Sequence, residues 1–460
     1  MKTTASHQEL SDSTSVRDFS GASSNDWYLP PVNDDTAKAL RAAAKADFMA
    51  NHDVRYPDLQ YQRLEELDMD TVEEMYQRLL VDAQSIDDEA ISDTTYEQAA
   101  RKLAELYRHK EVMRRLGWSA NQALSRERAG SMTIELFGEI ETEDFAHLIT
   151  DLRQKATSLA GQSTEAKELL TMLGDITSTT QEPDYEISAH AIEVLREDVY
   201  ELFPGLEEIV QQASPDNAPV EEKAAYWQHI LDNVCGQGQT RVVLVEGNEA
   251  ASTNAQEGTI TIGRERIAGY SSQQLVKTGI HESIGHMVRG LRAKQQEEAS
   301  MRTPQAGNLA FEEGFATGLE QIITGETRIA GEQYYLSIGL QQGIDRQGQT
   351  RDFRDTFEIM WRRLIVEELV AGRKLSREEA QNKAYTQVMR TNRGGALDAR
   401  DISYFNGSKY SYGWLNSISR LDKEARIDAL NIVLSARIDA TNNEQWQKAS
   451  KAYKEKQEAA

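Results

Sequence analysis

The stretch "GIHESIGHMVRG", residues 279–290, places two histidines five positions apart, with a glutamate directly after the first. In the related pattern H-E-x-x-H the histidines are four positions apart, share one face of a helix and bind zinc. Successive residues of an α-helix turn by about 100°, so a four-residue step leaves side chains roughly 40° apart and a five-residue step roughly 140° apart. His281 and His286 can therefore reach one metal ion only if the helix between them widens.

A widened, π-like turn would take in the one extra residue and bring His286 back to the face of His281. Such turns are rare and occur mostly at functional sites. Gly285 would ease the distortion because it has no side chain where the turn expands. Glu282 would then lie beside the metal, where it can take a proton from an attacking water. The alternative is that the spacing is a coincidence and the two histidines lie on different faces of an ordinary helix.

The histidines are expected on a helix that follows a small β-structure. Ser271 and Gln274 form a capping box at its start. Two stretches rich in β-branched residues, 240–247 and 258–265, precede it and predict a hairpin or small sheet. An apolar face is predicted from the spacing of six residues, namely Leu275, Ile280, Ile284, Met287, Val288 and Leu291.

The rest of the chain predicts a mainly α fold, since apolar residues recur at three- and four-residue spacing. We expect a disordered tail at 1–30, an N-terminal helical region at 31–235, a catalytic region at 236–425 and C-terminal helices at 426–460. Helices are predicted at 34–50, at 92–118, at 306–326 with an end near Gly325, at 352–372 with a stop at Gly372, and at 376–391, where Ser376 and Glu379 form a second capping box.

Charge and cysteine content narrow the class of protein. The 51 basic and 75 acidic residues give a formal charge of −24, which argues against nucleic acid or an anionic membrane as a partner. Cys235 is the single cysteine, so it forms no internal disulfide, and we expect it to be buried as a small hydrophobic residue. No signal peptide and no run of about 18 apolar residues is visible. We therefore expect a cytoplasmic location.

A third metal ligand is expected from a carboxylate. A catalytic zinc has three protein ligands and one position for water, and the other six histidines are scattered from His7 to His229. The segment "FEEGFATGLEQ", residues 311–321, supplies Glu313, with Glu312 as the alternative. Glu320 is a candidate for orienting one of the ligand histidines. Two histidines and a glutamate around zinc, with a further Glu as base, describe a zinc hydrolase.

The runs "HESIGHMVRGLR", "EEGFATGLEQ" and "NRGGALDARDISYFNG" resemble the QEGLA-motif family of zinc peptidases, which includes the microtubule-associated tyrosine carboxypeptidases. The upstream "NHDVRYPDLQY", residues 51–61, is similar to that family's N-P…Y element, so the resemblance spans residues 30–425. It implies a gluzincin-like metallopeptidase with one zinc per chain. It also implies His281, His286 and Glu313, rather than Glu312, as the ligands and Glu282 as the catalytic base.

The same resemblance places Asp401 and Tyr404 in the family's late block. The Tyr404 hydroxyl would donate a hydrogen bond to the developing oxyanion, although a buried structural tyrosine is the alternative. A carboxypeptidase must also neutralise a substrate carboxylate, for which Arg393, Arg400 and Lys409 are candidates, each with a solvated surface charge as the alternative. Phe315 and Arg400 replace the family's usual Leu and Lys, and neither change removes a metal ligand.

The sequence thus predicts a zinc peptidase that hydrolyses peptide bonds at the C-terminus of a peptide or protein. The resemblance implies an aromatic C-terminal residue, and an edge strand of the small sheet could hold the extended peptide. One alternative is a dipeptidyl peptidase III-like aminopeptidase, whose H-E-x-x-G-H motif has Gly at the position of Gly285. Another is a zinc-binding regulatory protein without turnover.

Overall fold

The computed structural model describes residues 34–57, 130, 133–134, 137–178, 185–297, 299–302, 307–326, 328–392 and 396–459. The predicted tail at 1–30, the predicted helix at 92–118 and residues 58–61 of the upstream element lie outside these ranges. The described chain is mainly helical and contains one small sheet, as the sequence predicted.

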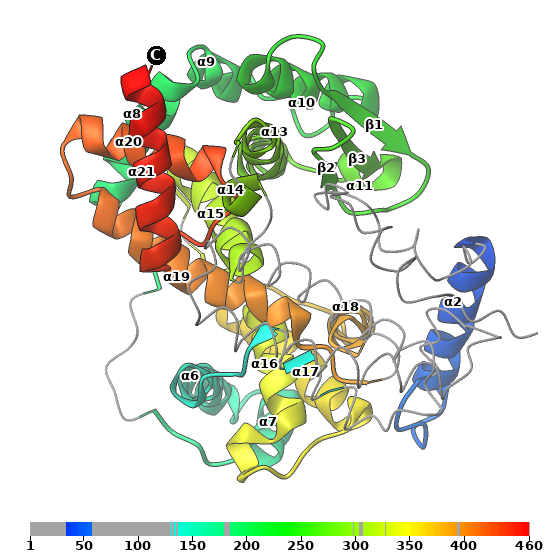
Figure 1. Cartoon of the computed structure of the whole chain (residues 1–460). Helices are drawn as coiled ribbons and strands as arrows, with labels where there is room; N and C mark the ends of the chain where they lie inside the picture. Colours follow the sequence, from blue (N-terminus) through cyan, green and yellow to red (C-terminus); the bar gives the residue numbers. More distant parts are fainter. Residues whose placement is uncertain are drawn as a thin grey trace, which may run out of the picture.

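The helices form an upper and a lower group, with α19 (Ile402–Ile418) between them and α15 (Asn308–Thr324) packed against α19 on its upper side (Figure 1). The upper group contains α8 (Ala189–Leu202), α9 (Leu206–Gln211), α10 (Val220–Cys235), α11 (Arg264–Ala268), α12 (Ser272–Ile280), α13 (Arg289–Lys294), α20 (Lys423–Ser435) and α21 (Asn443–Ala459). The lower group contains α6 (Thr142–Leu159), α7 (Thr164–Met172), α16 (Glu332–Gln342), α17 (Phe353–Val370) and α18 (Arg377–Arg390). The helix α2 (Asp34–Ala50) lies at one side.

The sheet has three strands in the order β1-β3-β2, where β1 is Arg241–Val245, β2 is Ser252–Asn254 and β3 is Thr259–Gly263. Both predicted strands are confirmed, but they pair in parallel and do not form a hairpin. The connection between them contains the short strand β2, which pairs antiparallel with β3. This connection turns the chain back before β3 begins, so that β1 and β3 run in the same direction.

Several helix ends lie where local sequence signals place them. Both capping boxes form, at the start of α12 with Ser271 and Gln274 and at the start of α18 with Ser376 and Glu379. Gly325 and Gly372 follow α15 and α17 with φ angles of 76° and 72°, a left-handed conformation that glycine adopts easily.

The two largest hydrophobic clusters among the described residues both include residues of α19. The upper cluster includes residues from Ile187 to Ala440, and the lower one includes residues from Phe48 to Phe405. Ile402 and Phe405, at the start of α19, belong to the lower cluster, whereas Tyr412, Trp414, Leu415 and Ile418 belong to the upper one. Each cluster therefore combines residues from both sides of the predicted boundary at 235, and the upper cluster also extends across the boundary at 425.

Candidate metal centre

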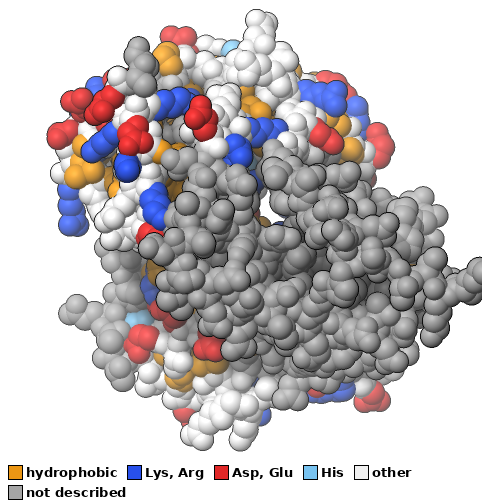
Figure 2. Space-filling model, in the orientation of Figure 1, with side chains coloured by type: hydrophobic (Ala, Val, Ile, Leu, Met, Phe, Trp, Pro, Cys, Tyr) orange, Lys and Arg blue, Asp and Glu red, His pale blue; other side chains and the backbone are white. Residues whose placement is uncertain are grey.

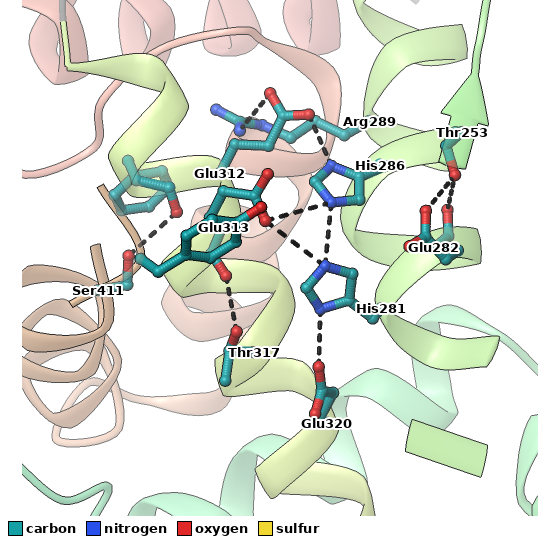
Figure 3. A network of polar contacts seen from close by, with 12 residues as sticks. Thr253, His281, Glu282, His286, Arg289, Glu312, Glu313, Thr317, Glu320 and Ser411 are labelled. Atoms are coloured by element: carbon teal, nitrogen blue, oxygen red, sulfur yellow. Dashed lines mark hydrogen bonds and ion pairs between the residues drawn. The ribbon is translucent and has the colours of Figure 1, made fainter. Parts of the chain in front are cut away.

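The segment His281–Val288 is a π-helix, η2, which continues directly from α12 and leads into α13. The widened turn predicted from the five-residue spacing is therefore present. Most of the expected apolar face is buried, since Leu275, Ile280, Ile284 and Met287 have no exposed surface and Val288 has almost none, while Leu291 is partly buried. This burial fixes the rotation of the helix, so that His281 and His286 point toward one another (Figure 3).

Gly285 has a second role beyond easing the turn. A Cβ atom at this position would lie 2.4 Å from Cβ of Ala316 in α15, much closer than two carbon atoms can approach. The helix that carries the histidines therefore packs directly against the helix that carries the glutamates, and only glycine permits this distance.

The helices α15 and α19 cross just as closely. A Cβ at Gly314 would lie 1.9 Å from the carbonyl oxygen of Gly407, and a Cβ at Gly407 would lie 1.9 Å from the carbonyl oxygen of Ala310. Glu313 is next to Gly314, so this crossing determines the position of its side chain. The two glycines at the crossing belong to the motif segments "EEGFATGLEQ" and "NRGGALDARDISYFNG".

Three side chains bring one ligand atom each to a common point, as predicted for His281, His286 and Glu313. The two Nε2 atoms are 3.1 Å apart, and Oε2 of Glu313 lies 3.6 Å from Nε2 of His281 and 3.8 Å from Nε2 of His286 (Figure 3). Each side chain keeps 15–16% of its surface exposed, so that small molecules can reach the group from solvent. These residues could hold a metal ion.

The outer nitrogen of each histidine contacts a different carboxylate. Nδ1 of His281 lies 2.7 Å from Oε1 of Glu320, and Nδ1 of His286 lies 2.8 Å from Oε1 of Glu312. Glu320 therefore has the orienting position predicted for it, while Glu312, the alternative ligand, orients the second histidine. Since an ionised carboxylate only accepts hydrogen bonds, each Nδ1 must carry the proton, and each Nε2 then presents a lone pair. When both histidines are neutral, two lone pairs and a carboxylate oxygen meet without a donor, and either a proton or a metal cation at this point would supply the missing positive charge.

Basic side chains stabilise both orienting carboxylates. Oε2 of Glu312 lies 3.3 Å from Arg289 and 3.5 Å from Arg437, and it accepts a hydrogen bond of 3.0 Å from Asn308. Arg328 donates to Oε2 of Glu320 at 2.8 Å. Sequence patterns gave no sign of these partners, because each lies at least four residues away and Arg437 comes from the far end of the chain.

The pKa shifts of the histidines and carboxylates also indicate that the site favours a positive charge. Burial alone would lower the pKa of His281, but hydrogen bonds to Glu313 and Glu320 raise that pKa well above its usual value. Burial also opposes ionisation of Glu312, yet the charge of Arg437 and the hydrogen bond to His286 hold the pKa of this carboxyl well below its usual range. The histidines are therefore surrounded by ionised carboxylates, whose charge a bound cation would neutralise.

Glu282, the predicted base, is buried next to the triad but is not part of it. Its Oε2 accepts a 2.6 Å hydrogen bond from Oγ1 of Thr253 in β2. Figure 3 shows this side chain pointing toward the sheet and away from Glu313. Thr253 was not predicted, because β2 is three polar residues long and has no hydrophobic alternation by which to recognise it.

Tyr404 and Asp401 lie at the start of α19, on the Glu313 side of the site. The charge of Glu313, together with burial, raises the pKa of Tyr404 above its usual value. Arg390 bonds both residues: its Nε donates to Oδ2 of Asp401 at 2.5 Å and its Nη2 to the Tyr404 hydroxyl at 3.2 Å. Arg390 was not among the predicted site residues.

The three predicted carboxylate-binding residues have different outcomes. Arg393 lies outside the described residues. Arg400 is half-buried in the short 3₁₀-helix η5 (Ala399–Asp401), near enough to Tyr404 for its charge to lower that pKa. Lys409 binds two carboxylates at the start of α6, those of Glu141 at 2.7 Å and Asp144 at 2.8 Å. Lys409 is thus engaged by carboxylates of α6, whereas the carboxylate-binding role of Arg400 stays a prediction.

Charged side chains of both signs lie on the described surface (Figure 2). Figure 2 shows Lys and Arg side chains interspersed with Asp and Glu over the upper left of the face, where α20 and α21 lie. None of the described helices is long and apolar enough to span a lipid bilayer. Cys235 is half-buried and packs against the upper hydrophobic cluster, close to the environment expected for it.

Comparisons with known proteins give no assignment: no protein-family model matches this chain, and no curated protein matches it either. A functional assignment therefore depends on the geometry of the site and on the motifs in the sequence.

Proposed function

We propose that this protein is a zinc-dependent peptidase in which Glu282 is the general base. One observation carries the proposal. Two histidine nitrogens and the carboxylate oxygen of Glu313 converge, and a fourth carboxylate besides those of Glu312, Glu313 and Glu320, that of Glu282, lies beside them without joining them. A site that only binds a metal does not need the fourth carboxylate. A hydrolase does, because a base must take the proton of the attacking water.

Zinc fits the donor set. Tetrahedral zinc with bonds of about 2.0–2.1 Å to nitrogen and oxygen separates its ligand atoms by about 3.3 Å, close to the 3.1, 3.6 and 3.8 Å among the three ligand atoms. Two histidines and one glutamate leave a fourth position for water or substrate. Zinc bound here would supply a Lewis acid that polarises a peptide carbonyl and makes water more acidic.

The protein's own residues have separable roles in this proposal. Glu282 takes a proton from the water and passes it to the leaving amine. Glu312 and Glu320 hold the two histidines in the tautomer that presents Nε2. The hydroxyl of Tyr404 donates a hydrogen bond to the oxyanion that forms on the carbonyl.

We further propose a gluzincin-like enzyme that removes a C-terminal residue, since the motif segments resemble those of the tyrosine carboxypeptidases. An extended substrate could pair with β2, whose Thr253 already contacts Glu282. A cytoplasmic location agrees with the single cysteine.

Replacing Glu282 with Gln tests the proposal, with the exposed Glu265→Gln as control. Both variants and the wild type would be loaded with zinc, incubated with a peptide library and analysed by mass spectrometry. We expect the wild type and the control to release single C-terminal residues, and Glu282→Gln to keep its zinc while hydrolysis falls by about 10²–10⁴-fold. Dipeptides released from N-termini would favour the aminopeptidase, and a zinc-loaded wild type that cleaves nothing would indicate a regulatory zinc protein.

A further inference from the structure

Arg390, at the end of α18, joins three elements next to the proposed metal site. Its guanidinium binds Asp401 through Nε at 2.5 Å and Nη2 at 3.4 Å, the Tyr404 hydroxyl through Nη2 at 3.2 Å and the Tyr334 hydroxyl through Nη1 at 3.1 Å. It also lies over the rings of both tyrosines, 4.6 Å from the centre of Tyr334 and 5.3 Å from that of Tyr404. These contacts fix the guanidinium firmly, although a third of the side chain is exposed.

A guanidinium can only donate hydrogen bonds, and this fact determines where the Tyr404 proton points. The tyrosine oxygen accepts the N–H of Arg390, so the single hydroxyl proton must be directed at something else. Among the described residues no acceptor for that proton lies within hydrogen-bond distance. The Tyr404 hydroxyl is thus a donor held ready for a ligand.

The backbone places this donor at the metal site. Tyr404 precedes Gly407 by one helical turn, and Gly407 touches α15 at Gly314, the neighbour of Glu313. On the other side, a Cβ at Gly331 would lie 2.5 Å from Cβ of Tyr404, so α16 also packs tightly against this residue. Tyr404 therefore packs against the start of α16, one helical turn before the point where α19 touches α15 beside Glu313.

We infer that Arg390 is a positioning residue, which directs the Tyr404 hydroxyl proton toward the carbonyl oxygen of the substrate. This inference depends on the proposed peptidase function and on the oxyanion role of Tyr404. The sequence motifs did not indicate Arg390. The inference also gives Asp401 a role, because its buried carboxylate holds Arg390 in place.

Arg390 is not the clamp for a substrate carboxylate, despite its charge. Of its five N–H groups, the one on Nε, both on Nη2 and one on Nη1 are used by Asp401, Tyr404 and Tyr334. One N–H remains, whereas a two-pronged contact with a carboxylate needs two parallel donors. The positive charge is also already balanced by Asp401.

A double-mutant cycle on the zinc-loaded full chain tests the inference. Arg390→Gln, Tyr404→Phe and the double variant would be compared on a peptide with a free C-terminus and on its C-terminal amide, with zinc content measured for each. The exposed Arg373→Gln serves as control. Arg390→Lys, which keeps one donor and the charge, guards against misfolding of the glutamine variant.

We expect Arg390→Gln and Tyr404→Phe each to lower kcat by about 10²-fold with little change in KM or in zinc content. The double variant should be no slower than Tyr404→Phe alone, because Arg390 acts through the hydroxyl. Arg390→Lys should recover part of the rate, and only while Tyr404 is present.

Losses that multiply in the double variant would overturn the inference. A rise in KM confined to the free-carboxylate peptide would also overturn it and would make Arg390 a carboxylate clamp. Failure of the peptidase proposal is distinguishable, because then the wild type would cleave neither peptide.

Discussion

Among the described residues, the hydroxyl of Thr253 is the single hydrogen-bond donor to the carboxylate of Glu282. A hydrogen bond to a charged group contributes about 1.5–3 kcal/mol, and about 1.4 kcal/mol corresponds to a tenfold change in rate. Thr253→Val, which keeps the shape and removes the hydroxyl, should therefore lower kcat by roughly 10- to 100-fold and leave zinc content unchanged. Thr253→Ser should stay near the wild-type rate. A valine variant as active as the wild type would show that Glu282 needs no such support.

The thiol of Cys235 should be unreactive in the folded protein. Burial raises its pKa to about 12, and only the thiolate reacts with alkylating agents. Iodoacetamide at pH 8 should therefore label the native chain slower than the urea-unfolded chain by on the order of 10²- to 10³-fold, as followed by mass spectrometry. Equal labelling rates in both states would contradict this burial.

The crossing of α15 and α19 sets the position of Glu313, so a methyl group there should disturb both stability and metal binding. In Gly314→Ala the new Cβ would meet a backbone carbonyl at 1.9 Å, and the helices would have to separate. We expect a loss of about 3 kcal/mol in the free energy of unfolding and weaker zinc binding.

Gly413→Ala is the matched control for this change. Gly413 lies in α19, the helix against which Gly314 packs, and is exposed, and no described atom outside its own stretch of helix lies within 4 Å of its added Cβ. This substitution should stabilise the protein by about 0.5–1 kcal/mol, because alanine favours a helix over glycine. If urea denaturation gave both variants the same midpoint, the close packing at Gly314 would not matter.

Local patterns in the sequence predicted the elements, while the contacts between elements had to come from the structure. The five-residue spacing of His281 and His286 predicted the π-turn, because only a widened turn brings the two side chains to one face. Thr253 and Arg390 could not be predicted in this way, because no local spacing marks them. Each acts on a residue of another element, 29 and 14 positions away, and nothing in the neighbouring sequence marks that contact.

The buried hydrogen bonds of Arg289 connect α13, which continues the helix of the two histidines, to the C-terminal part of the chain. Arg289 is fully buried and donates to the carbonyl oxygens of Val433, Ala436 and Ile438, at 3.2, 3.1 and 2.5 Å, besides its contact with Glu312. Burial lowers its pKa to about 10, so the side chain keeps its charge at neutral pH. Arg289 also donates to Oδ1 of Asn308 at 2.9 Å. A residue that binds five groups from two distant segments should be important for folding as well as for the site.

Arg289→Met should therefore destabilise the protein by about 3–5 kcal/mol, because Glu312 and the three carbonyls lose a buried partner. Arg292→Met is the control on the same helix, since Arg292 is only half-buried; among the described residues it makes one hydrogen bond, of 3.4 Å to Asn431, and lies over the ring of Phe203. Its cost should stay within about 1 kcal/mol. Equal shifts of the urea midpoint in the two variants would argue against a structural role specific to Arg289.

The existence of the metal centre is tested most directly by the zinc content of the purified, zinc-replete protein beside its His286→Ala variant. We predict about one zinc per chain in the wild type and almost none in the variant, because a five-residue step brings both histidines to one ion only through η2. A wild-type protein without zinc, or a variant that keeps it, would mean that His281, His286 and Glu313 converge without forming a zinc site.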